Sequence, residues 1–421
     1  MLPARNYVQT LLPALLFGGL LSACGSQPLS TLQPTAASQP TSAPQPTATA
    51  QPTAAPQATT TAVPRIAGRV LPAPLLFLRA GQIVRMERDG KTITPITHEQ
   101  PGQPDILAVV NFDVSPLDGS LVYVVQARDG NMLVHSDAEG QQRTVLLPKT
   151  SINNLRWSPD GTRIALQISD PPETSTEPVG GVYLISANGG APQLLQPNDR
   201  TDPTSPSPDA RGYLPHAWSP DGKQLLLSAY GLSVEVCSAA VKDIATGALV
   251  PIQAPKGMVS GCASGQWGLD GRTIYISMAR PGPQPPVPGL WQADPKTGAI
   301  TPFLQAEFEV GGYQLVTNYR PLKDGGVYAF VATVKQLPDP LSSVIVPYKL
   351  WQGAQTDGLF LRKEQFSVVG QALWATDTSG VVIDMPKGDT GNVITAWIPV
   401  NGDGVVELGT FMGEIKHWAR N

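Results

Sequence analysis

The chain has 421 residues and a formal net charge of −4, and only 15% of its residues are charged. It contains no basic run or basic helix, so nucleic acid is not an expected partner. Its 41 glycines and 43 prolines make up about a fifth of the sequence, which favours short strands and turns over long helices.

The N-terminus has the pattern of a secretory signal. Arg5 precedes an uncharged apolar run from Leu11 to Cys24, which is shorter than the roughly 20 apolar residues that span a bilayer. The run ends in Leu-Ser-Ala-Cys, and this ending resembles the bacterial lipobox. The resemblance implies that residues 1–23 are a lipoprotein signal peptide and that Cys24 carries a diacylglyceryl group and an acylated amine, which together anchor the chain in a membrane. An ordinary cleaved signal with an incidental cysteine is the alternative.

Residues 24–65 are predicted to be a tether. No charged residue occurs from Gly25 to Pro64, and the segment consists mainly of Thr, Ala, Pro, Gln and Ser. Such a composition cannot bury enough apolar surface to offset the entropy of ordering, so we expect a disordered, partly extended linker. Anchor and tether together predict an extracytoplasmic protein, held by its lipidated N-terminus at the cell surface or on the periplasmic face.

Two series of turns alternate along residues 66–421, which are predicted to form one domain. The first series follows an apolar strand and contains Ser-Pro-Asp-Gly or a remnant of it. Proline sets φ for the second position of a type I turn, aspartate tolerates the third, and glycine can take the positive φ of a tight β-hairpin. Six sites carry this signal: Ser115–Gly119, Ser158–Gly161, Ser219–Gly222, Trp267–Gly271, Tyr319–Gly325 and Leu373–Gly380.

The second series places Asp or Asn near Gly after an apolar strand. It has seven members: Arg88–Gly90, Asp137–Gly140, Asn188–Gly190, Asp243–Gly247, Asp294–Gly298, Asp357–Gly358 and Asn401–Gly404. Together the two series delimit units of four strands, a to d, in which the first kind of turn joins a to b and the second joins c to d.

The two ends of this domain complete each other. The first unit, Leu75 to Thr97, has strands b, c and d only, and Ile415 to Trp418 resembles the missing strand a. We therefore predict an all-β propeller of four-stranded blades, closed by pairing of the N- and C-terminal strands. Seven blades are predicted, with six as the alternative.

The repeat also resembles a known family. Trp-Ser-Pro-Asp-Gly followed by "IALQI" and then by "GVYLISANGG" (Gly181 to Gly190) is similar to the TolB-type, WD40-like propeller repeat, which also occurs in prolyl oligopeptidase-like enzymes. The resemblance covers roughly Pro72 to Asn421 and is strongest at Trp157–Gly161 and Trp218–Gly222. It implies the fold. Neither the α/β domain of TolB nor the hydrolase domain of the peptidases is recognised, so neither family's function is expected to follow.

Little in the sequence points to catalysis. There is no Gly-x-Ser-x-Gly motif, and the four histidines are not in a metal-binding spacing, so we expect no catalytic residue, no metal and no cofactor. If strand a lines the central channel, the residue before the Trp position would face it. Four of these residues are candidate ligands for an ion or a small polar molecule, or for acid–base chemistry: Asp113, Arg156, Gln266 and His417. A channel lined by mutually satisfied polar groups and water is the alternative.

Two cysteines remain beyond the signal. Outside the cytoplasm, Cys237 and Cys262 form a plausible disulfide, because they flank one repeat junction. Two separately buried thiols are the alternative.

The long connections predict a binding face. Asp170 to Gly180, Arg280 to Gly289 and Lys335 to Tyr348 join strand b to c, and Asn198 to Gly212 joins d to the next a, so all four emerge on one face. We expect a non-enzymatic binding or scaffold module for a protein or glycan partner on this b–c/d–a face. The alternatives are a propeller lyase or hydrolase with its site at the channel mouth, and an accessory subunit of an envelope complex similar to TolB.

Overall fold

The computed structural model describes residues 68–99, 106–169, 179–199, 211–231, 237–255, 259–279, 289–304, 313–334, 347–354, 357–367, 369–387, 392–402, 404–410 and 416–420. They belong to one compact unit, Pro64–Leu337 with Ile345–Asn421. The predicted signal peptide, the lipidation site Cys24 and the predicted tether lie outside the described residues and stay predictions. Within these ranges, no helix is long and apolar enough to cross a membrane.

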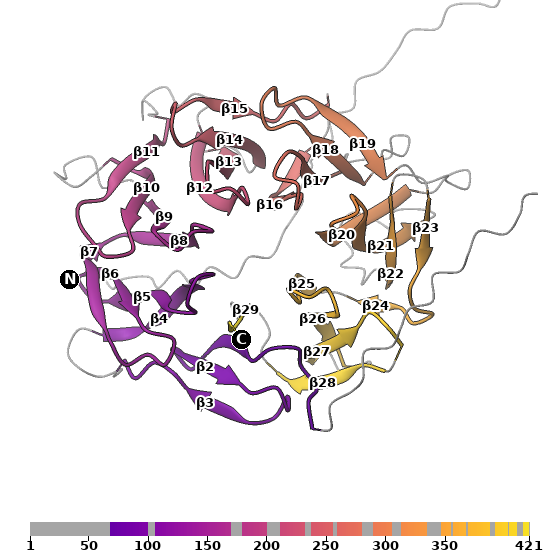
Figure 1. Cartoon of the computed structure of the whole chain (residues 1–421), viewed down its shortest axis with the longest axis horizontal. Helices are drawn as coiled ribbons and strands as arrows, with labels where there is room; N and C mark the ends of the chain where they lie inside the picture. Colours follow the sequence, from indigo (N-terminus) through magenta and orange to yellow (C-terminus); the bar gives the residue numbers. More distant parts are fainter. Residues whose placement is uncertain are drawn as a thin grey trace, which may run out of the picture. The chain divides into compact units, whose positions relative to one another are not determined.

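Seven antiparallel sheets are arranged in a ring, and each contributes a blade of four strands that runs outwards from the centre (Figure 1). Every regular element in the described ranges is a strand. The prediction of seven blades is therefore confirmed, and the six-blade alternative is wrong.

In the first four blades, the strands follow one another from the centre outwards. Blade 1 has β29 (Lys416–Trp418), β1 (Leu75–Arg79), β2 (Gln82–Met86) and β3 (Ile93–Pro95). Blade 2 has β4 (Ile106–Val114), β5 (Leu121–Ala127), β6 (Gly130–Ser136) and β7 (Thr144–Thr150). Blade 3 has β8 (Ile152–Trp157), β9 (Arg163–Ile168), β10 (Gly181–Ser186) and β11 (Gln193–Pro197). Blade 4 has β12 (Arg211–Trp218), β13 (Gln224–Gly231), β14 (Cys237–Asp243) and β15 (Leu249–Pro251).

The remaining three blades follow the same order. Blade 5 has β16 (Val259–Trp267), β17 (Ile274–Ala279), β18 (Leu290–Ala293) and β19 (Ile300–Leu304). Blade 6 has β20 (Tyr313–Pro321), β21 (Val327–Val334), β22 (Pro347–Ala354) and β23 (Asp357–Phe360), and the short β24 (Phe366–Ser367) also pairs with β22. Blade 7 has β25 (Val369–Trp374), β26 (Gly380–Pro386), β27 (Val393–Pro399) and β28 (Val406–Gly409).

The Ser-Pro-Asp-Gly turns form as their chemistry predicts. In the turn after β8, the Ser158 amide donates to the Arg163 carbonyl at 2.8 Å, and the Ser158 hydroxyl donates to the Asp160 carboxylate at 2.6 Å. Gly161 closes the turn with φ +67°, and a Cβ added there would lie only 2.8 Å from the Cβ of Leu117 in the neighbouring turn. One turn of the second series differs from its prediction: in blade 6, Asp357 and Gly358 already pair with β22, so the turn precedes them.

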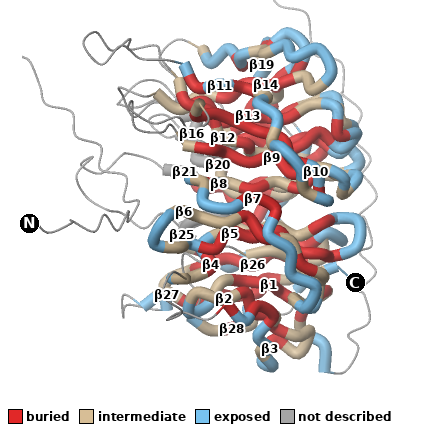
Figure 2. The backbone as a smooth tube through the Cα atoms, turned by 90° about the vertical axis from the view of Figure 1, so that its left-hand side faces the viewer, coloured by how far each residue is buried: buried red, intermediate tan, exposed pale blue. Residues whose placement is uncertain are grey.

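The hydrophobic core lies between neighbouring blades. One cluster combines Val122, Val124 and Leu133 of blade 2 with Leu155 and Trp157 of blade 3, and comparable clusters occupy other junctions. Figure 2 shows buried residues along the strands and exposed ones at the turns. Because each sheet buries both faces against its neighbours, no blade is complete until the ring closes.

Ring closure uses the two ends of the domain. β29 pairs antiparallel with β1, with Trp418 opposite Leu75 and His417 opposite Leu76, as predicted from the turn series. The Lys416 ammonium also reaches blade 7, where it lies 2.9 Å from an Asp384 carboxylate oxygen, and the two side chains are 8% and 7% exposed. Thr395 donates to the other oxygen of Asp384 at 2.6 Å.

We expect Lys416→Ala to lower the free energy of unfolding by about 3 kcal/mol, because it removes the buried ammonium that compensates the charge of the buried Asp384 carboxylate at the seam. Chemical denaturation of the full-length chain measures the change. The control is Lys387→Ala, which removes an exposed ion pair with Glu407 and should change stability by at most about 1 kcal/mol. Equal effects of the two substitutions would contradict a role of the buried pair in closure.

Candidate functional site

The innermost strands of the seven blades surround the axis of the ring (Figure 1). The residue before the Trp position occupies the same register in each strand; Arg156, for example, pairs with Ala165, and Gln266 pairs with Tyr275. We call this the inner position. From blade 1 to blade 7 it is held by His417, Asp113, Arg156, Ala217, Gln266, Arg320 and Leu373, and all seven residues are partly exposed.

The sequence-predicted candidates Asp113 and His417 meet at the junction of blades 1 and 2. One carboxylate oxygen of Asp113 lies 3.4 Å from His417 Nδ1, and the other accepts a hydrogen bond from the Trp157 amide of blade 3 at 2.7 Å. His417 also forms a hydrogen bond with the Phe112 backbone and contacts the Phe112 ring edge-on. Asp113 therefore links three successive blades.

The third candidate, Arg156, is also used between blades. Its Nε donates to the His216 carbonyl of blade 4 at 2.6 Å, and Nη1 donates to the Leu155 carbonyl at 2.6 Å. His216 is a bulge residue of β12, and its Nε2 lies 2.6 Å from the Gly265 carbonyl of blade 5. This distance requires Nε2 to carry the proton, because a carbonyl oxygen can only accept.

The contacts of His417, Asp113, Arg156 and His216 form a series of hydrogen bonds between innermost strands, which we call the belt. Tryptophans extend the belt. In several blades the indole Nε1 donates to a backbone carbonyl of the preceding blade's innermost strand: Trp218 to Arg156, Trp267 to Ala217, Trp374 to Asn318 and Trp418 to Trp374, at 2.7–3.1 Å. Trp157 departs from the pattern, since its buried Nε1 has no hydrogen-bond partner in the described part of the chain.

The electrostatics of the belt favour neutral histidines. Burial and the nearby Arg156 guanidinium lower the pKa of His216 to about 4. Burial also lowers the pKa of His417, and Arg156 adds to this effect while Asp113 opposes it. The Asp113–His417 contact is therefore made by a neutral imidazole at pH 7. No group of three or more potential metal ligands occurs among the described residues.

Gln266 and Arg320 differ from the other polar residues at the inner position. Neither side chain forms a hydrogen bond or ion pair in the described ranges, and Arg320 Nε is buried without a partner. Arg320 was not among the sequence candidates, because its strand lacks the Trp and the turn that follows it is degenerate, whereas Asp113 precedes the clear Ser115–Gly119 turn. Pairing of Arg320 with Tyr328 and of Pro321 with Val327 places Pro321 at the Trp position. The signal that could have found it is the degenerate turn at Asp324-Gly325.

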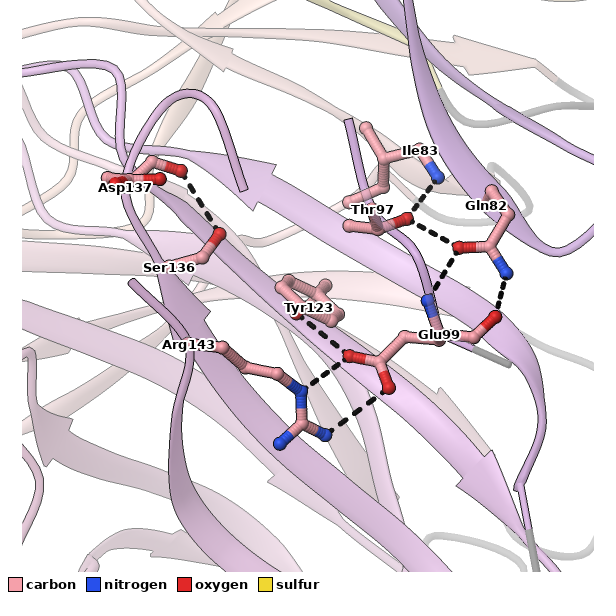
Figure 3. A network of polar contacts seen from close by, with 8 residues as sticks. All are labelled: Gln82, Ile83, Thr97, Glu99, Tyr123, Ser136, Asp137 and Arg143. Atoms are coloured by element: carbon pink, nitrogen blue, oxygen red, sulfur yellow. Dashed lines mark hydrogen bonds and ion pairs between the residues drawn. The ribbon is translucent and has the colours of Figure 1, made fainter. Parts of the chain in front are cut away.

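A second polar network lies between blades 1 and 2, away from the inner position (Figure 3). The Glu99 carboxylate is 6% exposed, accepts from Arg143 Nε at 2.7 Å and accepts from the Tyr123 hydroxyl at 3.0 Å. Gln82 accepts from the Glu99 amide at 3.0 Å on the other side. Every charge in this cluster is matched, which identifies it as a joint between blades. Glu99 and Arg143 are 44 residues apart in the sequence, and no local signal predicts that they pair.

The described residues test the predicted Cys237–Cys262 disulfide only in part. Cys237, at the start of β14, is disulfide-bonded. β14 and β16 lie against each other, and Cys262 is in β16. The side chain of Cys262 lies outside the described residues, so its pairing with Cys237 stays a prediction.

The four long connections of the predicted binding face also lie almost entirely outside the described residues, but the strands that flank them are described. Three join the end of strand b to the start of c, after Ile168, Ala279 and Val334, and one joins β11 to β12. In an antiparallel blade these ends lie at the same edge. At the β11–β12 connection, the Asp199 amide donates to the Arg211 carbonyl at 2.8 Å, so its two ends are adjacent.

No family model matches the sequence, and no curated protein matches it. Solved structures do resemble the fold. A puromycin hydrolase is 12% identical with a TM-score of 0.54, over 81% of this chain and 54% of that one. An oligogalacturonate lyase from Vibrio parahaemolyticus is 12% identical with a TM-score of 0.51, over 82% and 86%. TolB from Acinetobacter baumannii is 14% identical with a TM-score of 0.42, over 82% and 66%.

The fold and these comparisons define the chain as a β-propeller of seven four-stranded blades. It spans about half the length of the puromycin hydrolase. At such identities the likeness shows the fold alone, so neither enzymatic status nor a reaction type follows from it.

The belt makes stability depend on pH. Below pH 6.5 the unfolded state protonates His216, whereas the folded state resists protonation down to about pH 4. The free energy of unfolding should therefore fall as the pH drops from 6.5 towards 4, by up to about 3 kcal/mol from this residue. His417 acts in the same direction. Urea denaturation at several pH values in this range measures the free energy of unfolding. In His216→Gln, whose amide can still donate to Gly265, this free energy should change less with pH than in the unsubstituted chain. An unchanged pH dependence would contradict the assignment.

Proposed function

We propose that this chain is a lipid-anchored, extracytoplasmic β-propeller that acts as a non-enzymatic binding or scaffold module for a protein or glycan partner. The observation that carries the proposal is the position of the long connections. All four belong to b–c or d–a junctions, whereas the described a–b turns are short. Elaboration on one side of a repeat fold builds an extended surface on a rigid scaffold.

The residues near the inner position also support a non-enzymatic role. Asp113, Arg156 and His216 are engaged in hydrogen bonds between blades, and His417 contacts Asp113 at the same belt. A catalytic base needs a lone pair directed at a substrate proton. Groups already committed to holding neighbouring blades are poorly suited to that task.

The adjacent ends of the β11–β12 connection allow a clean deletion. Replacing residues 200–210 by Asn-Gly joins Asp199 to Arg211 through a two-residue hairpin turn and leaves both strands in place. In a pull-down from envelope extract read by mass spectrometry, we expect a partner that the full-length chain retains and the deletion variant loses.

The matched control changes the opposite face. Arg272 and Lys296 are exposed in an a–b and a c–d turn of blade 5, so the double variant Arg272→Glu, Lys296→Glu should keep the partner. Loss of the partner only in this control would place binding on the a–b/c–d face and would contradict the proposed b–c/d–a binding face. Co-purification with membrane proteins would favour the variant of the proposal in which the chain is an accessory subunit of an envelope complex.

The competing function is a lyase or hydrolase with its site at the ring axis, and the Asp113–His417 contact is what favours it. We expect the purified chain to show no peptidase or polysaccharide lyase activity above that of Asp113→Asn, a substitution that keeps an acceptor for the Trp157 amide. An activity present in the full-length chain and lost in Asp113→Asn, with folding intact by circular dichroism, would establish the enzyme instead.

A further inference from the structure

The polar groups at the ring axis divide the blades into two sets. From blade 1 to blade 5 the belt is continuous, because His417, Asp113, Arg156 and His216 each contact the blade that follows. At the inner positions of blades 5 and 6 it stops. There the Gln266 carboxamide and the Arg320 guanidinium have no partner among the described residues.

Arg320 is the more unusual of the two. A guanidinium stays charged at any physiological pH, so it cannot escape burial by losing its proton. A charge held partly out of water without a counter-ion is unfavourable, and buried arginines are normally paired. Arg320 Nε is buried, and burial is the one cause that shifts the pKa of this side chain, which it lowers. No carboxylate in the described ranges compensates the charge.

Among the described residues, none accepts a hydrogen bond from the Arg320 side chain. Across the strand pair it faces Tyr328, whose ring stacks on Trp374 of blade 7 with centroids 5.5 Å apart. The inner position of blade 7 is Leu373, and that of blade 4 is Ala217. Two uncommitted hydrogen-bond donors, one of them cationic, therefore lie on neighbouring innermost strands between two apolar inner positions.

We propose that Arg320 and Gln266 form a binding site for a carboxylate group at the axis of the ring. The planar guanidinium presents parallel N–H donors that match the two oxygens of a carboxylate, and the Gln266 amide supplies a further neutral donor. The partial exposure of both residues leaves the site open to a ligand at the axis. The inference does not depend on the b–c/d–a face, so the two can fail separately.

The probe is acetate. Thermal unfolding of the full-length chain is followed at pH 7 in sodium acetate and in sodium chloride of equal ionic strength. We expect acetate to raise the melting temperature with a saturable concentration dependence. Arg320→Met should abolish this response, and in chloride it should melt above the unsubstituted chain, because a partly buried charge without a counter-ion has been removed. Gln266→Leu should weaken the response without abolishing it.

Several results would overturn the site. One is an acetate response in Arg320→Met equal to that of the unsubstituted chain, and another is a response that does not saturate. Lower stability of Arg320→Met in chloride would show that the guanidinium has a structural role. Phosphate stabilising more than acetate would exclude a carboxylate as the preferred ligand class. Arg272→Met, which removes an exposed arginine from a turn, is the matched control and should respond like the unsubstituted chain.

Discussion

The structure depends on closing a ring of sheets whose two faces are both apolar. A blade in this chain cannot stand alone, since its buried side chains are shared with the blades on either side. An open ring would expose two such faces and two innermost strand edges. The pairing of β29 with β1 and the Lys416–Asp384 ion pair therefore affect every junction, although they involve few residues. Closure also explains why the first blade is assembled from both ends of the domain.

The same constraint determines what the polar residues near the axis do. Innermost strands have one edge without a strand partner, and their backbone groups must find other partners or water. Asp113 accepts from the Trp157 amide, Arg156 donates to the His216 carbonyl, and indoles donate across several junctions. Residues that look like a catalytic set in the sequence are thus used to join blades. The break in the belt at Gln266 and Arg320 is what distinguishes a candidate ligand site from a structural one.

Solved structures with a similar propeller include proteins of different function. A puromycin hydrolase and an oligogalacturonate lyase have similar propellers at 12% identity. A shared fold does not determine function, which depends on the sites built on it. In this chain the candidate sites are the inner positions without a hydrogen-bond partner and the long connections on the b–c/d–a face.

The local chemistry of the turns was sufficient to predict the number of blades, the order of their strands and the closure, because Pro, Asp and Gly act on φ within four residues. These short-range preferences can be recognised in the sequence at Ser158–Gly161, and in part in the degenerate copies of the turn. The candidate site was only partly predictable: Asp113, Arg156, Gln266 and His417 were found from their offset to Trp or to the turn after strand a, whereas Arg320 was missed where Trp is absent and the turn is degenerate. Only the tertiary structure decided which of these side chains are already bonded, and it alone joined Glu99 to Arg143. The reason is physical, because a hydrogen bond between blades depends on the register and twist of two sheets together, and no single stretch of sequence encodes both.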